Sequence, residues 1–365
     1  MIQRIVGITV CALLTACAPG AQAGGTAADG PSASVSSPAR FAYVTNQNDA
    51  TVSVIDMADH RVTETVDLQA LGFSANAKPH HIEVEPDGSF WYVSLIGDNA
   101  VLKFDRQNRV VGRTTFEVPG ILALHPTEDI LFVGRSMSAV NPPHSIGMIR
   151  RSDMTLLAEQ DVFFGRPHAL GAANAGPIAW VASLASNRWA AVDFAEEDVA
   201  LVELPGDETH VLVEFAISPD GGLLVGTAQL TNQVFVYDVT DPMAPELLRR
   251  IPVGVHPWHP AFSPDGRWLW VPNKMSNSIS LIDTRSWEVV DTITGRGLAQ
   301  PHGSAVSPDG RWVFVSNNNL AGDHMEGHAE EPGTVVVIDT GTHEIVQVLT
   351  IGHNPTGLGA PDLRG

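Results

Sequence analysis

The sequence predicts an all-β fold, a seven-bladed β-propeller with four antiparallel strands in each blade. Residues 41–365 contain no long apolar stretch of helical period, only short alternating or β-branched runs separated by Gly, Pro, Asn and Asp. One phrase, an aromatic residue or Leu followed by Val and then small or polar residues, recurs at intervals of 40 to 49 residues. A repeat of this length is typical of propeller blades.

Turn sequences separate the strands of the repeated unit. The phrase begins at Tyr43, Tyr92, Phe132, Trp180, Leu224, Trp270 and Phe314. Pro-Asp-Gly precedes the phrase at 86–88, 219–221, 264–266 and 308–310. Pro presets φ for such a turn, Asp caps it and Gly takes the left-handed position. Each unit of about 45 residues therefore holds four short strands.

The two ends of the repeat region predict how the ring closes. Residues 41–68 supply only the three outer strands of a first blade, whereas residues 354–359 match an innermost strand. We expect the last segment to complete the first blade, because closure pairs sheet edges that would otherwise be exposed.

These residues resemble a known repeat family. Tyr43-Val44-Thr45-Asn46, the recurring Val-Ile-Asp and the Ser-Pro-Asp-Gly turns are similar to the YVTN-type β-propeller repeats. Relatives include the propeller domains of dissimilatory nitrite reductase and, more distantly, nitrous oxide reductase. The resemblance implies a cofactor at the channel mouth, either non-covalent haem or copper held by a ring of histidines. This chain departs from the copper pattern, since two of its blades lack a histidine there even when His210 is counted for the blade of Glu214.

The N-terminal region predicts export and lipid anchoring. Residues 5–14 form an apolar run too short to span a bilayer, which is typical of a signal peptide. Leu14-Thr15-Ala16-Cys17 resembles the bacterial lipoprotein box, which implies a signal peptide over 1–16 and lipidation of Cys17. The alternative is ordinary cleavage after Ala23. Residues 17–40 predict a flexible tether, and 41–365 the propeller, on the periplasmic side of the outer membrane or the cell surface.

Composition narrows the possible partners. Acidic residues outnumber basic ones by 41 to 21, a net charge of −20, which excludes nucleic acid as a partner. Both cysteines, Cys11 and Cys17, lie in the N-terminal region, so the propeller has no disulfide, thiol nucleophile or covalent haem motif. We expect a monomeric propeller whose partners are the membrane, through Cys17, and an envelope protein.

Histidines recur where the innermost strands begin. Aligning these strands on their turns places the following pairs at one channel mouth: His80-His81, Gly120-Ile121, His168-Ala169, Val213-Glu214, Trp258-His259, His302-Gly303 and Pro355-Thr356. Clustered imidazoles bind metals, so the candidate ligands are His80, His81, His168, His259 and His302. Further candidates at the mouth are Glu214, Trp258, His210, Arg135 and Arg166.

Two long loops should overhang this mouth. One runs from Arg135 to His144, and the other, over 317–333, holds the candidate ligands His324 and His328. The second loop is equally well interpreted as a solvated acidic lid. Met275 beside the histidines favours copper, whereas carboxylates favour zinc, iron or manganese. Haem is the further alternative, with Arg135, Arg166 and His302 around it.

Three functions stay open. The leading hypothesis is an envelope lipoprotein that binds a metal ion, copper first, or a metallocofactor at the mouth. The second is a lactonase or lyase in which Glu214 or a histidine acts as general base. The third is an interaction scaffold that needs no site. No nucleophile elbow, Walker loop or Rossmann loop is present, so the sequence does not decide whether the protein is an enzyme.

Overall fold

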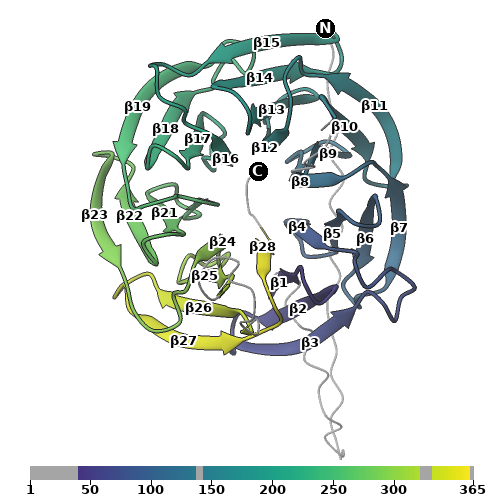
Figure 1. The fold of residues 1–365 in the computed structure, drawn as a ribbon, viewed down its shortest axis with the longest axis vertical. Helices are drawn as coiled ribbons and strands as arrows, with labels where there is room; N and C mark the ends of the chain where they lie inside the picture. Colours follow the sequence, from purple (N-terminus) through teal and green to yellow (C-terminus); the bar gives the residue numbers. More distant parts are fainter. Residues whose placement is uncertain (1–39, 137–142, 321–330, 362–365) are drawn as a thin grey trace, which may run out of the picture. The chain divides into compact units, whose positions relative to one another are not determined.

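The structure is a computed structural model that describes residues 40–136, 143–320 and 331–361. Within these ranges all regular structure is β-strand, arranged as seven four-stranded antiparallel sheets around a central channel (Figure 1). The predicted seven-bladed propeller is confirmed. No helix in the described ranges is long and apolar enough to cross a membrane. The expected signal peptide and Cys17 lie outside the described residues.

The blades follow the chain, and each is listed from the channel outward. Blade 1 comprises β28 (Pro355–Gly359), β1 (Phe41–Asn46), β2 (Thr51–Asp56) and β3 (Arg61–Asp67). Blade 2 comprises β4 (Pro79–Val84), β5 (Phe90–Leu95), β6 (Ala100–Asp105) and β7 (Val110–Thr115). Blade 3 comprises β8 (Pro119–Leu124), β9 (Ile130–Arg135), β10 (Ser145–Arg150) and β11 (Thr155–Asp161). Blade 4 comprises β12 (Pro167–Ala172), β13 (Ile178–Ser183), β14 (Arg188–Asp193) and β15 (Asp198–Glu203).

The last three blades have the same order. Blade 5 comprises β16 (Leu212–Ile217), β17 (Leu223–Ala228), β18 (Gln233–Asp238) and β19 (Glu246–Pro252). Blade 6 comprises β20 (Ala261–Phe262), β21 (Trp268–Asn273), β22 (Ser278–Asp283) and β23 (Glu288–Ile293). Blade 7 comprises β24 (Pro301–Val306), β25 (Trp312–Asn317), β26 (Thr334–Asp339) and β27 (Ile345–Thr350).

The apolar core lies between neighbouring blades. The recurring phrase forms the second strand of each blade, and its aromatic residue packs on the next sheet, as Trp180 does against blade 5. Between blades 1 and 2, Trp91 stacks on Phe104 at 3.9 Å and on Tyr43 at 4.7 Å between ring centroids. Each sheet thus has both faces covered, and only the outermost strands expose many of their side chains.

The Ser-Pro-Asp-Gly sequences form the turns between the first and second strands. Ser218 Oγ donates to Asp220 Oδ1, which also accepts the N–H of Gly222. Gly221 has φ of +75°, which explains why the turn uses glycine. Blades 6 and 7 repeat the Ser-to-Asp hydrogen bond at 263–265 and 307–309.

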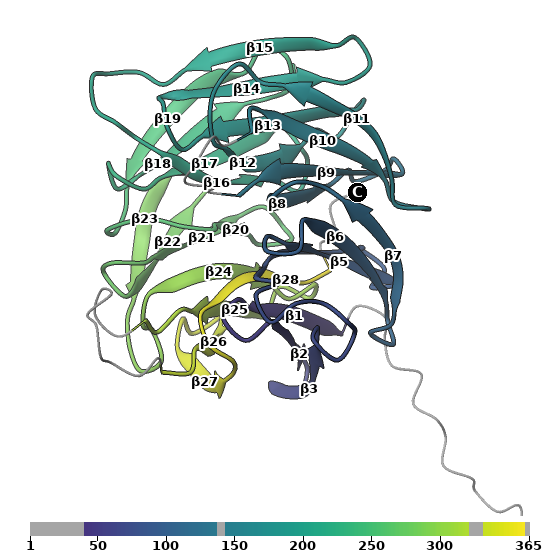
Figure 2. The same cartoon turned by 45° about the vertical axis from the view of Figure 1, so that its right-hand side comes forward.

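The ring closes through the C-terminal strand, as the sequence predicts. β28 pairs antiparallel with β1, and Figures 1 and 2 show the two side by side in blade 1. The N–H of Gly357 donates to Thr45 Oγ1 at 2.8 Å, and Thr356 Oγ1 donates to the carbonyl of His80 at 3.0 Å. A side chain on Gly357 would meet that same carbonyl, since an added Cβ would lie 2.5 Å from it. The closing strand therefore joins blade 1 to the histidine-bearing strand of blade 2.

Deletion of residues 353–365 should open the ring. The deletion removes β28, leaves an edge of β1 unpaired and breaks the contacts to His80, so we expect a lower thermal unfolding midpoint and concentration-dependent association. A synthetic peptide spanning 353–365, added in trans, should raise the midpoint again, and a scrambled peptide should not. Unchanged melting and a monomeric truncated protein would contradict this account of closure.

Candidate functional site

The candidate site is built from the first residues of the innermost strands, which carry a repeated irregularity. In blade 2, Pro79 pairs with Leu95 and Ile82 with Val93, so His80 and His81 together oppose the single residue Ser94. Such a bulge breaks the strict alternation of a strand and redirects side chains. Register shifts occur at the same point in the innermost strands of blades 1, 3, 4, 5 and 7. This irregularity allows two consecutive side chains to face the channel.

Hydroxyl groups of the recurring phrase support the bulges. Ser94 Oγ accepts the N–H of His81 at 3.1 Å, and Ser316 Oγ accepts the N–H of Gly303 at 2.9 Å. Thr45 serves Gly357 in the same way in blade 1. The small polar residue after Val in the phrase thus satisfies backbone groups that the bulge leaves unpaired.

A second repeated feature fixes the register. Each innermost strand is preceded by a non-glycine residue in the left-handed region, namely Lys78, Val118, Arg166, Val211, His256, Gln300 and Asn354, with φ between +40° and +57°. The expected pairs are confirmed in register for six blades. In blade 1, Pro355 pairs with Asn46 and is equivalent to Pro79, so the pair is Thr356-Gly357 and not Pro355-Thr356. The sequence alignment was wrong by one residue there because this strand lacks its own Pro-Asp-Gly turn.

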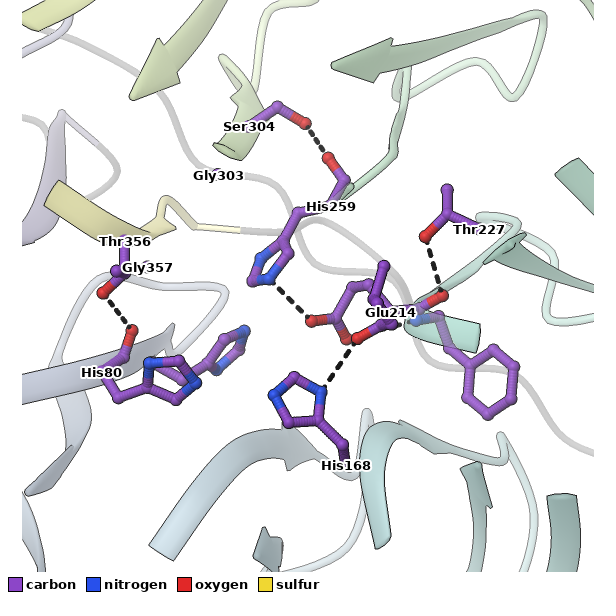
Figure 3. A network of polar contacts seen from close by, with 12 residues as sticks. His80, His168, Glu214, Thr227, His259, Gly303, Ser304, Thr356 and Gly357 are labelled. Carbon is purple, nitrogen blue, oxygen red and sulfur yellow. Dashed lines mark hydrogen bonds and ion pairs between the residues drawn. The ribbon is translucent and has the colours of Figure 1, made fainter. Parts of the chain in front are cut away.

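The structure brings His81, Glu214 and His259 together as a buried cluster. One ligand atom from each lies within 4.8 Å of the others. His259 Nε2 lies 3.0 Å from Glu214 Oε2, and neither atom has another polar partner among the described residues. An imidazole nitrogen and a carboxylate oxygen this close, with His81 beside them, can act as ligands of one metal ion. Figure 3 shows His259 and Glu214 meeting in the channel, with His80 and His168 beside them.

His80 and His168 form a second pair. Their rings lie 5.9 Å apart, and His168 Nδ1–H donates to the carbonyl of Val213 at 3.0 Å. His80 Nδ1 lies 3.2 Å from Gln47 Oε1. Both Nε2 atoms are therefore acceptors without a proton in the neutral ring, and both are buried without a partner. In His81 the roles differ, because its Nδ1 accepts the N–H of Leu122 at 3.2 Å, so the neutral ring carries its proton on Nε2, and a metal ion at Nε2 would have to replace that proton.

Burial sets the charge states in the channel. It lowers the pKa of the histidines, to about 3 for His81, to about 4 for His168, and well below the ordinary value for His80, His259 and His302. Burial also raises the pKa of Glu214 well above the ordinary carboxyl range, and the charge of Glu83 adds to this shift. The imidazoles are thus neutral at pH 7, the state in which they bind metals.

Other predicted residues have different places. His302 and Trp258 stack in the channel with ring centroids 4.2 Å apart, and His302 lies 4.9 Å from the His259 ring. Arg166 occupies the left-handed position before β12. Met275, cited for copper, has an exposed side chain. His324 and His328 lie outside the described residues.

Two of the predicted residues have purely structural contacts. His210 donates from Nε2 to the carbonyl of Pro205 and bonds Thr231 through Nδ1, both at 2.9 Å, and it is fully buried. Both of its ring nitrogens are therefore occupied. Arg135 bonds the carbonyl of Glu117 and the carboxylate of Glu159, and it lies over the ring of Phe116. Neither residue belongs to the cluster in the channel.

A cavity of about 170 Å³ adjoins the cluster. His81, Glu214 and His259 line its inner end, and apolar residues such as Leu170 and Phe215 form its walls. Its other end reaches the prolines of the Ser-Pro-Asp-Gly turns. This is the end of the channel opposite to the one that the long loops over 135–144 and 317–333 were expected to overhang.

Two charged residues of the channel escaped sequence reasoning. Glu83 lines the cavity, two residues after His81 on β4, and the alternation of a strand was the signal that could have found it. Lys274 lies with its Nζ 4.7 Å from the centroid of the Trp258 ring, and burial lowers its pKa to about 8. Nothing in the local sequence marks Lys274 as buried.

Comparison with known proteins supports the fold. The family model for YNCE-like beta-propellers matches residues 4–363. The dihydro-heme d1 dehydrogenase NirN in complex with DHE matches with a TM-score of 0.61 and 16% identity, over 90% of this chain and 76% of that one. A functionally unknown protein from Desulfotomaculum acetoxidans DSM 771 matches with a TM-score of 0.67 and 13% identity, over 88% of this chain and 98% of that one. Streptogramin B lyase matches with a TM-score of 0.61 and 15% identity, over 78% of this chain and 87% of that one. No curated protein sequence matches.

Stability should fall below about pH 6.5, because the unfolded chain takes up protons on histidines that the folded channel keeps neutral. Substitution His302→Phe keeps an aromatic ring and removes one such group. We expect the unfolding midpoint of the variant, relative to wild type, to be a few degrees higher at pH 5.0 than at pH 7.5. The exposed His144→Ala is the control and should show no such difference. An equal effect of His302→Phe at both pH values would contradict the assignment.

Proposed function

The chain belongs to the YNCE-like beta-propeller family, and on that premise we propose that it binds a divalent transition-metal ion at His81, Glu214 and His259. The observation that carries this proposal is the buried cluster itself, with three ligand atoms within 4.8 Å of one another. Apart from each other, Glu214 Oε2 and His259 Nε2 have no polar partner among the described residues, and such buried groups are stabilised by an ion that binds both.

The donor set favours particular metals. Two imidazoles and one carboxylate suit zinc, iron(II) or manganese(II). The part of the case for copper that came from Met275 is lost, because its side chain is exposed and is not a member of the cluster. Three protein ligands also leave coordination positions open, and the cavity offers space beside them for water or a small ligand.

A hydrolase or lyase activity is the second candidate function, and the cavity favours it. A bound metal would act as Lewis acid on a small ligand, with a carboxylate as base. At about 170 Å³ the cavity is smaller than the roughly 300 Å³ of drug-sized pockets. It therefore suits a small substrate better than a haem-sized macrocycle. Streptogramin B lyase shows that this fold accommodates a lyase. Export and lipid anchoring at Cys17 complete the proposal.

The proposal is tested by metal content. The chain with Cys17→Ser, exported and purified without a histidine tag, should contain about one metal ion per chain by mass spectrometry. Substitutions Glu214→Gln and His259→Ala each remove a ligand and should weaken zinc binding by more than about 100-fold, since loss of groups that only support ligands costs about 10–100-fold.

The control variant loses one histidine, as His259→Ala does, but at a site away from the cluster. His144→Ala removes an exposed histidine and should leave zinc binding unchanged. Circular dichroism should show every variant folded. Metal content that is equal in Glu214→Gln and wild type, or a wild type that takes up no zinc, iron, manganese or copper, would overturn the proposal.

A further inference from the structure

The cavity meets the metal cluster from one side of the ring. Its wall begins at the third residue of the innermost strands, with His81, Glu214 and His259, and continues to Pro219, Pro264 and Pro308 of the turns. The residues one position earlier in these strands do not line it. His80 Nε2, His302 Nδ1 and Trp258 Nε1, on the loop side, are buried without partners. Solvent therefore reaches the cluster from the turn end.

Negative charge follows this cavity. Glu83 and Glu214 line it, and Glu83 is partly exposed between the cluster and the turn end. No lysine or arginine belongs to its lining among the described residues. Because Glu83 and Glu214 line the same cavity, a cation held at Glu83 can move to Glu214 within it.

Aspartates border the outer end of the cavity. Each of its turn prolines is followed by an aspartate, and these are Asp220, Asp265 and Asp309. In each, Oδ1 accepts hydrogen bonds within its own turn. Each aspartate therefore lies one residue from the cavity wall, and three carboxylates near one end of the cavity add their fields.

The opposite end carries a positive charge. Lys274 lies beside Trp258, and no carboxylate of the described residues forms an ion pair with it. Its ammonium group raises the electrostatic potential near His80, His259 and His302, where it disfavours their protonated forms. A cation approaching from the loop end would meet this repulsion.

We propose that the cavity is a one-ended cation route in which a hydrated divalent cation enters between the turn aspartates, binds transiently at Glu83 and passes to His81, Glu214 and His259. This inference rests on the proposed function, because it takes that cluster as the destination. Glu83 is then a kinetic site, which changes the rate of binding and release more than the final affinity.

The test is the rate of Co²⁺ binding, followed by stopped-flow absorbance at several salt concentrations. The triple variant Asp220→Asn, Asp265→Asn, Asp309→Asn keeps the Oδ1 acceptor of each turn and removes its charge. We expect association to slow by about tenfold at low salt, with a weaker salt dependence and an unchanged dissociation rate. Glu83→Gln should slow both association and dissociation.

Matched controls locate the effect. The triple variant Asp161→Asn, Asp198→Asn, Asp241→Asn removes the same charge at other sites whose Oδ1 also accepts a backbone N–H, and it should leave the rates unchanged. Lys274→Met should also leave association unchanged, because the cation does not pass it.

Two outcomes would overturn the route. One is an unchanged association rate in the turn triple variant and in Glu83→Gln, and the other is faster association in Lys274→Met. Glu83→Gln carries the test alone if the triple variant does not fold. Failure of the proposed function is distinguishable, since wild type would then bind no Co²⁺ at equilibrium, or Glu214→Gln would bind it as well as wild type.

Discussion

The pairing of β28 with β1 is the contact on which the ring depends, because it makes neighbours of strands more than 300 residues apart in the chain. Thr356 Oγ1 donates to the carbonyl of His80 at 3.0 Å, and Thr45 Oγ1, 2.9 Å from Thr356 Oγ1, can donate its one proton to that hydroxyl. The same hydroxyl groups thus close the ring and hold the strand that carries His80 and His81. The geometry of the site therefore depends on ring closure, because a ring that opens at blade 1 would also release the histidines of blade 2.

The bulge at the start of the innermost strands of six blades turns this ring into a site. A regular strand presents every second residue to one face, so His80 and His81 would face opposite ways. The bulge, supported by Ser94, lets consecutive residues reach the channel. The proposed metal site uses only the second residue of each pair, His81, Glu214 and His259. The first residues, His80, His168 and His302, do not line the cavity, although the His302 ring lies 4.9 Å from that of His259.

The sequence predicts the fold well because the repeat encodes it many times. Seven phrases and four Pro-Asp-Gly turns predict strand number and order. Blades 1, 3 and 4 lack this turn, and the alignment was wrong by one residue in blade 1, whose innermost strand comes from the other end of the chain. The site is predicted less well. Repeat alignment selects residues by position in a strand, which is why His80, His81 and His259 were found. It cannot reveal that His210 is fully hydrogen-bonded by Pro205 and Thr231, or that Arg135 serves Glu159, because those contacts join segments that are distant in sequence. The burial of Lys274 likewise depends on blades that meet only in three dimensions.

Charge balance explains why a cation would bind at His81, Glu214 and His259 and not at the histidines on the loop side, which are His80, His168 and His302. A divalent ion bound by Glu214 and neutral imidazoles leaves one positive charge uncompensated, and buried uncompensated charge is costly. Glu83 supplies a second negative charge on the cavity side of the same strand as His81. The rings of His80, His168 and His302 contact other histidine rings and no carboxylate of the described residues. This group of histidines faces the ammonium of Lys274. Under the proposed function, the acidic groups Glu83 and Glu214 on the cavity side and the ammonium of Lys274 on the loop side favour binding of a divalent cation at His81, Glu214 and His259.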